Sequence, residues 1–159
     1  MKTNGQIKKL GEVCDILDNR RKPITKRNRT TGEYPYYGAT GILDYVGDYI
    51  FDEKLVLIGE DGAKWESGES TAFLAEGKYW VNNHAHIIKG TDEAPTFYIY
   101  LIFRNTSIKP YITGAVQLKL TQENLNKIPV IIPSSDVMKQ FIIIVYPMIV
   151  KIRKCYEEN

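Results

Sequence analysis

The most constraining feature of this sequence is the change of pattern near its C-terminus. Residues 117–132, QLKLTQENLNKIPVII, predict a strand, a short helix capped by Thr121 and a second strand. Pro133 ends that strand, and a serine-capped helix follows it. We therefore expect a compact domain over residues 1–133 and a C-terminal helical arm over residues 134–159.

The predicted arm is apolar around most of its circumference. Its apolar positions are Phe141, Ile142, Ile143, Ile144, Val145, Met148, Ile149 and Ile152. One face of such a helix can cover this domain while the other packs on a partner helix, and a second copy of the chain is one candidate partner. A helix buried wholly within its own domain shows the same pattern, so both readings stay open. We expect Pro147 to kink the helix.

The rest of the chain predicts short strands mixed with short helices, which indicates an α+β fold class. The expected elements are a helical segment at 7–17, short strands within 34–51, a buried strand at 55–58, a strand at 71–74, one alternating strand at 79–88 and a helix at 95–104. The alternation would place His84 and His86 on one side of a single strand.

Composition excludes several classes of function. The net charge is only +2, and the two cysteines are too far apart in the sequence to suggest a metal site. The longest apolar run, residues 141–150, is too short to cross a bilayer, and the N-terminus does not resemble a signal peptide. We expect a cytoplasmic protein that needs no cofactor and binds no membrane.

A run of cations indicates nucleic-acid binding. Six basic residues and no acidic residue lie between positions 20 and 29: Arg20, Arg21, Lys22, Lys26, Arg27 and Arg29. Such a run is often only a solvated loop, but it also suits contact with DNA phosphates. The candidates for reading bases lie at predicted turns and strand ends: Lys64, Trp65, Asn82, Asn83 and Gln117.

Catalytic alternatives are weaker. Two histidines give too few ligands for a zinc site, so we predict no metal. A magnesium-dependent nuclease could use Asp61, Glu76 and Lys78, yet each of the two acids precedes a glycine, as hairpin turns also require. No nucleophile elbow or phosphate-binding loop occurs in the sequence, so we predict no catalytic residue.

Several motifs, taken in order, resemble the target-recognition domain of the specificity subunit of type I restriction–modification systems. They are IKKLGEV at 7–13, YPYYG at 34–38, TGI at 40–42, LIGEDGA at 57–63, NH at 83–84, TGAVQ at 113–117, LNKIPV at 125–130, Pro133, and Gln140 before Ile142. Recognition domains of single-chain restriction–methylation enzymes share this pattern.

The resemblance implies a binding subunit without catalysis of its own. Such a subunit would read a half-site in double-stranded DNA and direct methyltransferase (modification) subunits and a restriction subunit to it. A complete specificity subunit has two recognition domains separated by long paired helices, whereas this sequence has one domain and one short arm. It would be a half-subunit that dimerises or part of a longer chain. A module that binds only protein is a further alternative.

Overall fold

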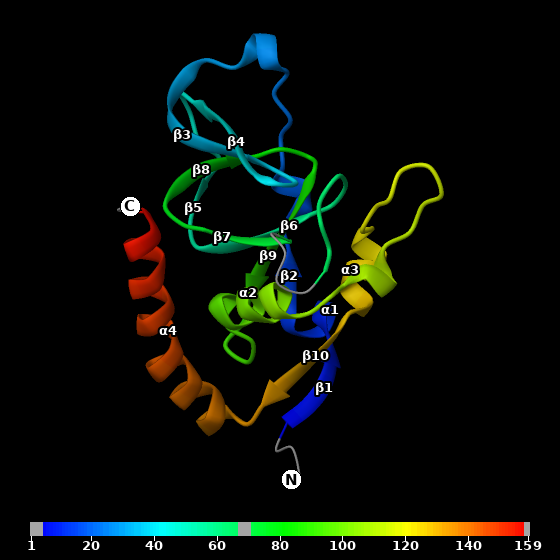
Figure 1. Ribbon diagram of the computed structural model, residues 1–159, viewed down its shortest axis with the longest axis vertical. Coiled ribbons are helices and arrows are strands. Elements are labelled where there is room, and N and C mark those ends of the chain that lie inside the picture. The colour runs from blue at the N-terminus through cyan, green and yellow to red at the C-terminus, as the bar shows by residue number, and fades with distance from the viewer. Residues whose placement is uncertain (1–4, 67–70, 158–159) are drawn as a thin grey trace.

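The computed structural model in Figure 1 describes residues 5–66 and 71–157 and is built around three small sheets. The strands are β1 (Gly5–Lys9), β2 (Cys14–Ile16), β3 (Thr31–Gly38), β4 (Gly41–Val46), β5 (Phe51–Asp52), β6 (Leu55–Gly59), β7 (Ala72–Ala75), β8 (Lys78–Val81), β9 (Ala85–Gly90) and β10 (Pro129–Pro133). The helices are α1 (Leu10–Val13), α2 (Thr96–Asn105), α3 (Gln122–Lys127) and α4 (Ser135–Glu157), with short 3-10 turns η1 (Asp18–Arg20), η2 (Lys26–Asn28) and η3 (Lys109–Tyr111). The expected α+β class is confirmed.

The central sheet has the strand order β2-β9-β6-β7 and separates two apolar cores. All five residues of β6 are buried. Because side chains alternate along a strand, Val56 and Ile58 pack into a core with α2, whereas Leu55 and Leu57 face the second sheet. The unbroken apolar run predicted at 55–58 is therefore a strand covered on both faces.

The second sheet has the order β4-β3-β8-β5. Its hairpin β3–β4 turns at Gly41, whose φ of 110° is readily adopted only by glycine. Strand β8 pairs in parallel with β3 and antiparallel with β5, so the sheet is mixed. The short strands predicted within 34–51 are confirmed.

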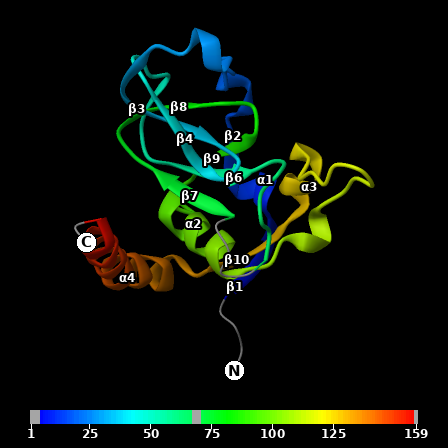
Figure 2. The same ribbon diagram turned by 45° about the horizontal axis from the view of Figure 1, so that its top comes forward.

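The third sheet pairs the first and last strands of the chain and leads into the arm. Strands β1 and β10 are antiparallel, with Gly5 opposite Pro133. The predicted cap is present, since the Thr121 hydroxyl accepts a hydrogen bond from the Asn124 backbone amide at 3.2 Å. In Figures 1 and 2, α4 runs from the end of β10 along one side of α2, and the loop before α3 projects from the opposite side.

Two predicted elements were wrong because long-range pairing overrides local periodicity. Residues 7–17 form β1, a one-turn α1 and β2, since the two strands pair with β10 and β9. Residues 79–88 form two strands joined by a turn, so His84 lies exposed in the turn and His86 lies buried in β9. Residues 117–120, expected to start a strand, make only isolated bridges through Lys119.

Two further features concern the helices and the two cysteines. Within residues 5–66 and 71–157, no helix has the length and apolar character needed to cross a membrane. Burial raises the pKa of the Cys14 thiol to about 12, which makes this core cysteine inert, whereas Cys155 is exposed on α4.

Candidate nucleic-acid interface

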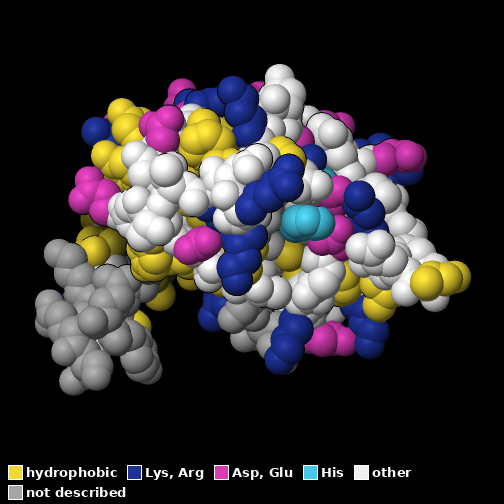
Figure 3. All heavy atoms as spheres, turned by 90° about the horizontal axis from the view of Figure 1, so that it is seen from above, with side chains coloured by type: hydrophobic (Ala, Val, Ile, Leu, Met, Phe, Trp, Pro, Cys, Tyr) yellow, Lys and Arg dark blue, Asp and Glu magenta, His cyan; other side chains and the backbone are white. Residues whose placement is uncertain are grey.

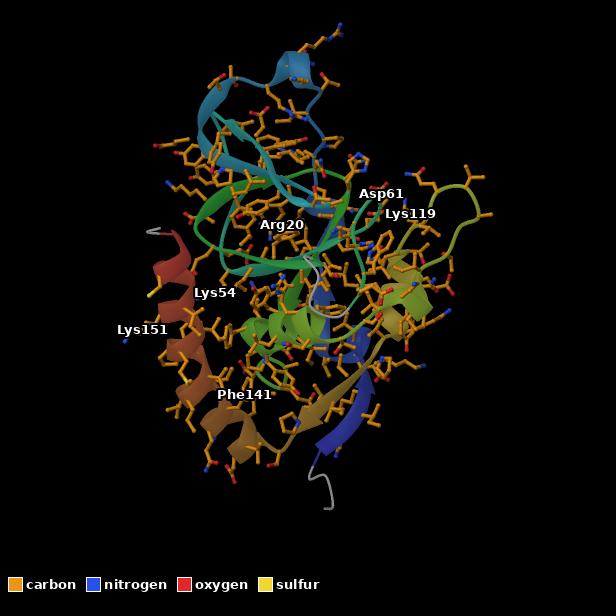
Figure 4. All side chains as sticks on the ribbon, in the orientation of Figure 1. Arg20, Lys54, Asp61, Lys119, Phe141 and Lys151 are labelled. Carbon is orange, nitrogen blue, oxygen red and sulfur yellow. The ribbon has the colours of Figure 1, made fainter. Side chains whose placement is uncertain are left out.

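Four segments that are distant in the sequence meet at one end of the central sheet, and we call their meeting point the loop junction. Its segments are residues 18–22, 60–62, 82–84 and 117–120. Backbone hydrogen bonds join them: the Glu60 amide donates to the His84 carbonyl at 2.8 Å, the Leu120 amide to the Glu60 carbonyl at 2.7 Å, and the Lys22 amide to the Val81 carbonyl at 3.2 Å. Figure 4 shows Asp61 and Lys119 side by side at this junction.

The inner layer of the junction is a network of charged side chains around Arg21. Its guanidinium forms an ion pair with Glu60 and lies 3.5 Å from an Asp18 carboxylate oxygen. The same group donates to the backbone carbonyls of Ala85, at 2.9 Å, and Asn83, at 3.3 Å. Through these contacts Arg21 connects its own segment with those of Glu60 and Asn83. Only 16% of its side chain is exposed, so it makes the connection from inside the junction.

Glu60 is the acidic centre of that network. Its side chain is 9% exposed and receives Arg21 and, at 2.6 Å, the Lys119 ammonium. Burial alone would raise the pKa of Glu60, but the hydrogen bonds from Lys119 and Arg21, together with nearby positive charge, hold that pKa below its usual value. The carboxylate is therefore a stable anion that keeps the junction closed.

His86 completes the inner layer through both of its ring nitrogens. Its Nε2 lies 2.7 Å from the Leu120 carbonyl and its Nδ1 lies 2.6 Å from Asp18. Although Asp18, Glu60 and His86 offer atoms within 4.8 Å of one another, both ring nitrogens are engaged and the Arg21 cation occupies the same space. This cluster fits a satisfied polar network better than a cation site.

The outer layer of the junction is centred on Asp61. One of its carboxylate oxygens lies 2.8 Å from His84 Nδ1, and the other accepts a hydrogen bond from the Gln117 amide at 3.4 Å. The Asp61 side chain is 14% exposed and the His84 side chain 49%. The carboxylate therefore holds two outward-facing polar side chains from different segments.

The predicted phosphate-binding residues divide into two groups. Arg20 pairs with Glu53 at 2.7 Å and stacks on Phe51, and Arg29 pairs with Asp44 at 3.1 Å. Arg21 lies in the inner network. The remaining cations, Lys22, Lys26 and Arg27, are exposed and have no side-chain hydrogen bond or ion pair within the part of the chain that the structure describes.

The predicted base-reading residues also divide. Trp65 is 9% exposed and its ring N–H donates to the Gly59 carbonyl at 3.1 Å, while Asn82 is 4% exposed and its side-chain oxygen accepts from the His84 amide at 2.8 Å. We leave both out of the interface, because their polar atoms are used inside the fold. Lys64, Asn83 and Gln117 are exposed.

The nuclease alternative was wrong because its residues do not meet. Strands β6 and β7 are antiparallel, with Leu55 opposite Ala75. Asp61 therefore follows one end of the hairpin and Glu76 the other, at least about 14 Å apart at about 3.4 Å per residue. Glu76 instead pairs with Lys54 at 2.9 Å, and Lys78 lies over the Tyr49 ring.

Sequence reasoning missed the roles of Glu60, His84 and Lys119 at the junction. Glu60 and Asp61 looked like turn residues before Gly62, and His84 like one of a strand pair. One sequence signal could have identified Glu60: two adjacent acids directly follow an apolar strand. A carboxylate buried at such a position needs a cationic partner, which points to basic side chains nearby.

Comparison with known proteins agrees with this geometry. Residues 3–147 match the model of the type I restriction modification DNA specificity domain. A putative type I restriction enzyme specificity subunit of Haemophilus influenzae is 37% identical over 135 residues, which cover 85% of this chain and 35% of that protein. The chain therefore belongs to the type I restriction–modification DNA specificity domain family.

Solved structures show the same fold. An S subunit of a type I restriction–modification system from M. genitalium superposes with a TM-score of 0.75 at 18% identity, over 99% of this chain and 42% of the other. An HsdS subunit from Thermoanaerobacter tengcongensis gives a TM-score of 0.57 at 14% identity, over 100% and 41%. The chain thus spans well under half the length of the relatives that it matches.

Proposed function

We propose that this domain binds double-stranded DNA sequence-specifically and acts as the specificity determinant of a type I restriction–modification system. The observation that carries the proposal is the loop junction of a specificity-domain fold, where exposed polar side chains from separate segments are held in place by a buried network. Fixed polar groups of this kind suit base edges, and the domain needs no metal or cofactor for such a role.

Phosphate contacts would come from the exposed cations of residues 22–27, at and beyond the end of the junction segment 18–22. Lys22, Lys26 and Arg27 carry charges that no acidic side chain offsets by a direct ion pair within the described residues. Three other cations already form ion pairs inside the fold: Arg20 with Glu53, Arg21 with Glu60 and Arg29 with Asp44. We therefore propose that they stabilise the fold and do not contact DNA. This division gives the proposal a residue-level test.

The test is selection of bound duplexes from a random pool at fixed salt, followed by affinity measurements on the selected site between about 50 and 200 mM salt. We expect one preferred half-site. Lys26→Ala should weaken binding to all sequences and lower the log–log salt slope by roughly 0.9. A chain that binds DNA without any sequence preference would refute the specificity claim.

We also propose that the outer face of α4 binds another helix, and that the domain works in the cytoplasm in an assembly with modification and restriction subunits. The inner face of α4 is held by Tyr146, whose ring lies 4.8 Å from that of Phe97, and by Phe141 against Tyr98. On the outer face, Val137, Ile144 and Met148 are exposed at 47%, 61% and 58%. These three positions, seven and four residues apart, form one exposed apolar stripe along the helix.

The partner helix would come from a second copy of this chain or from a longer specificity subunit that contains it. Measuring the solution mass of the full chain and of Ile144→Lys decides between them. A dimer that Ile144→Lys dissociates, and that Lys139→Glu on another side of α4 does not, supports the second copy. A monomer at high concentration indicates that the partner helix belongs to a longer chain.

A further inference from the structure

The His84 ring is an exposed side chain at the loop junction, and its Nδ1 is held by the Asp61 carboxylate. It lies in the turn between β8 and β9, with 49% of the side chain exposed. Figure 3 looks onto the domain from above and shows a histidine surface among Lys, Arg, Asp and Glu side chains. Of the two histidines, His84 is the exposed one, because the His86 side chain is only 2% exposed.

Three hydrogen bonds fix His84 from the inside. Its amide donates to the Asn82 side chain at 2.8 Å, its carbonyl accepts from the Glu60 amide at 2.8 Å, and its Nδ1 lies 2.8 Å from Asp61. The anchoring carboxylate is 14% exposed, so it lies beneath the ring. A hydrogen bond between a half-exposed imidazole and a carboxylate contributes only about 0.5–1.5 kcal/mol, so this contact is not a major support of the fold.

The Asp61 contact also determines which ring nitrogen is available. A carboxylate only accepts hydrogen bonds, so the proton of the neutral ring resides on Nδ1. Nε2 has no partner within residues 5–66 and 71–157 and is left as an acceptor. Each base pair presents one exocyclic amino donor in the major groove, N6 of adenine or N4 of cytosine, and its position differs among the four pairs.

We propose that His84 is a specificity-determining residue whose Nε2 accepts a hydrogen bond from an exocyclic amino group in the major groove, with Asp61 as its positioning residue. The inference rests on the proposed DNA-binding function and deepens it. Gln117, held by the other oxygen of Asp61, lies beside it and reads the neighbouring position. Lys22 and Lys26, which are both exposed, would contribute phosphate contacts and not base contacts.

The experiment uses the full chain and its selected site. The base-preference profile is measured for the wild type, His84→Ala and Lys22→Ala. His84→Ala should lose roughly 2- to 13-fold discrimination at one base pair, the range of a single neutral hydrogen bond, without changing the salt slope. Lys22→Ala should weaken all sequences alike and lower the salt slope by roughly 0.9.

A second arm removes the amino group from the DNA. Purine in place of the preferred adenine, or pyrimidin-2-one in place of cytosine, should weaken wild-type binding by the same factor and leave His84→Ala unaffected. Asp61→Ala should relax the same base pair and add little there to His84→Ala, because at that position it acts through the ring. It should also relax the neighbouring position, where Gln117 loses its anchor. Thermal unfolding of each variant confirms that it is folded.

The outcomes separate the two claims. If the wild type selects no site, the proposed function fails and this inference fails with it. If the wild type selects a site and His84→Ala keeps the entire profile, or weakens every sequence uniformly, only the inference is refuted.

Discussion

Replacing Arg21 by methionine should damage the fold far more than it damages phosphate binding. The guanidinium neutralises Glu60, approaches Asp18, and donates to the carbonyls of Ala85 and Asn83. Removing one partner of a buried ion pair costs about 3–5 kcal/mol. Lys119 still reaches Glu60 at 2.6 Å and offsets part of that loss, so we expect about 2–3 kcal/mol.

For a chain of this size, 1 kcal/mol corresponds to about 2–4 °C in melting temperature, so Arg21→Met should lower Tm by about 4–12 °C. Thermal or urea unfolding followed by circular dichroism measures the change. Glu60→Gln in the Arg21→Met background should recover part of the loss, because a neutral amide needs no buried counter-charge.

The adjacent Lys22→Met variant is the matched control. Lys22 is exposed and its side chain has no partner among the described residues. The free energy of unfolding of Lys22→Met should therefore differ from that of the wild type by less than about 0.5 kcal/mol. Its DNA salt slope should nevertheless fall. If Arg21→Met unfolds like the wild type and instead lowers the salt slope, the inner-network argument is wrong.

Three further predictions concern the junction and the arm. The pKa of Glu60 is lower in the folded protein than its unfolded value of about 4.3. The stability that Glu60 supplies is therefore present above that value and is lost as the pH falls through the folded pKa. In Glu60→Gln, the free energy of unfolding should consequently depend less on pH below about 4.5. At Gly114, where φ is 111° and an added Cβ would lie 2.0 Å from the Gln117 carbonyl oxygen, alanine should distort the 113–119 loop and weaken DNA binding. Gly62→Ala, with φ 64° and free space, should cost only about 1–2 kcal/mol. Tyr146→Ala should loosen α4 from Phe97 and Lys54, which faster amide exchange in α4 but not in β6 would reveal.

Much of the fold could be predicted from local sequence because several signals required no distant partner. The apolar run at 55–58 was short enough to indicate a buried strand. Thr121 was a suitable N-cap residue for the short helix after it, and no helix-breaking residue lay between Pro133 and Pro147. Predictions failed where pairing decided the outcome. Residues 7–17 had helical spacing, yet their backbone pairs with β9 and β10 across more than 70 positions.

The candidate site was only partly predictable for the same reason. The sequence shows six cations between residues 20 and 29, but not that Arg20, Arg21 and Arg29 have acidic partners 33, 39 and 15 residues away. It also hides the turn that separates His84 from His86, since that turn is capped by the Asn82 side chain and closed by the Glu60 amide. Such contacts exist only after the sheet has formed.

The two layers of the loop junction divide stability from recognition. Changes to Arg21, Glu60 or His86 disturb bonds shared by all four segments, so they should act on folding regardless of the DNA sequence. Changes to the side chains of His84, Gln117 or Asn83 alter outward-facing groups and leave the inner bonds intact. Asn83 takes part in the inner layer only through its backbone carbonyl, which accepts from Arg21. A domain built this way can acquire a new target by substitution in its outer layer at little cost to its fold, because the bonds that position the loops do not include the groups that would contact the bases.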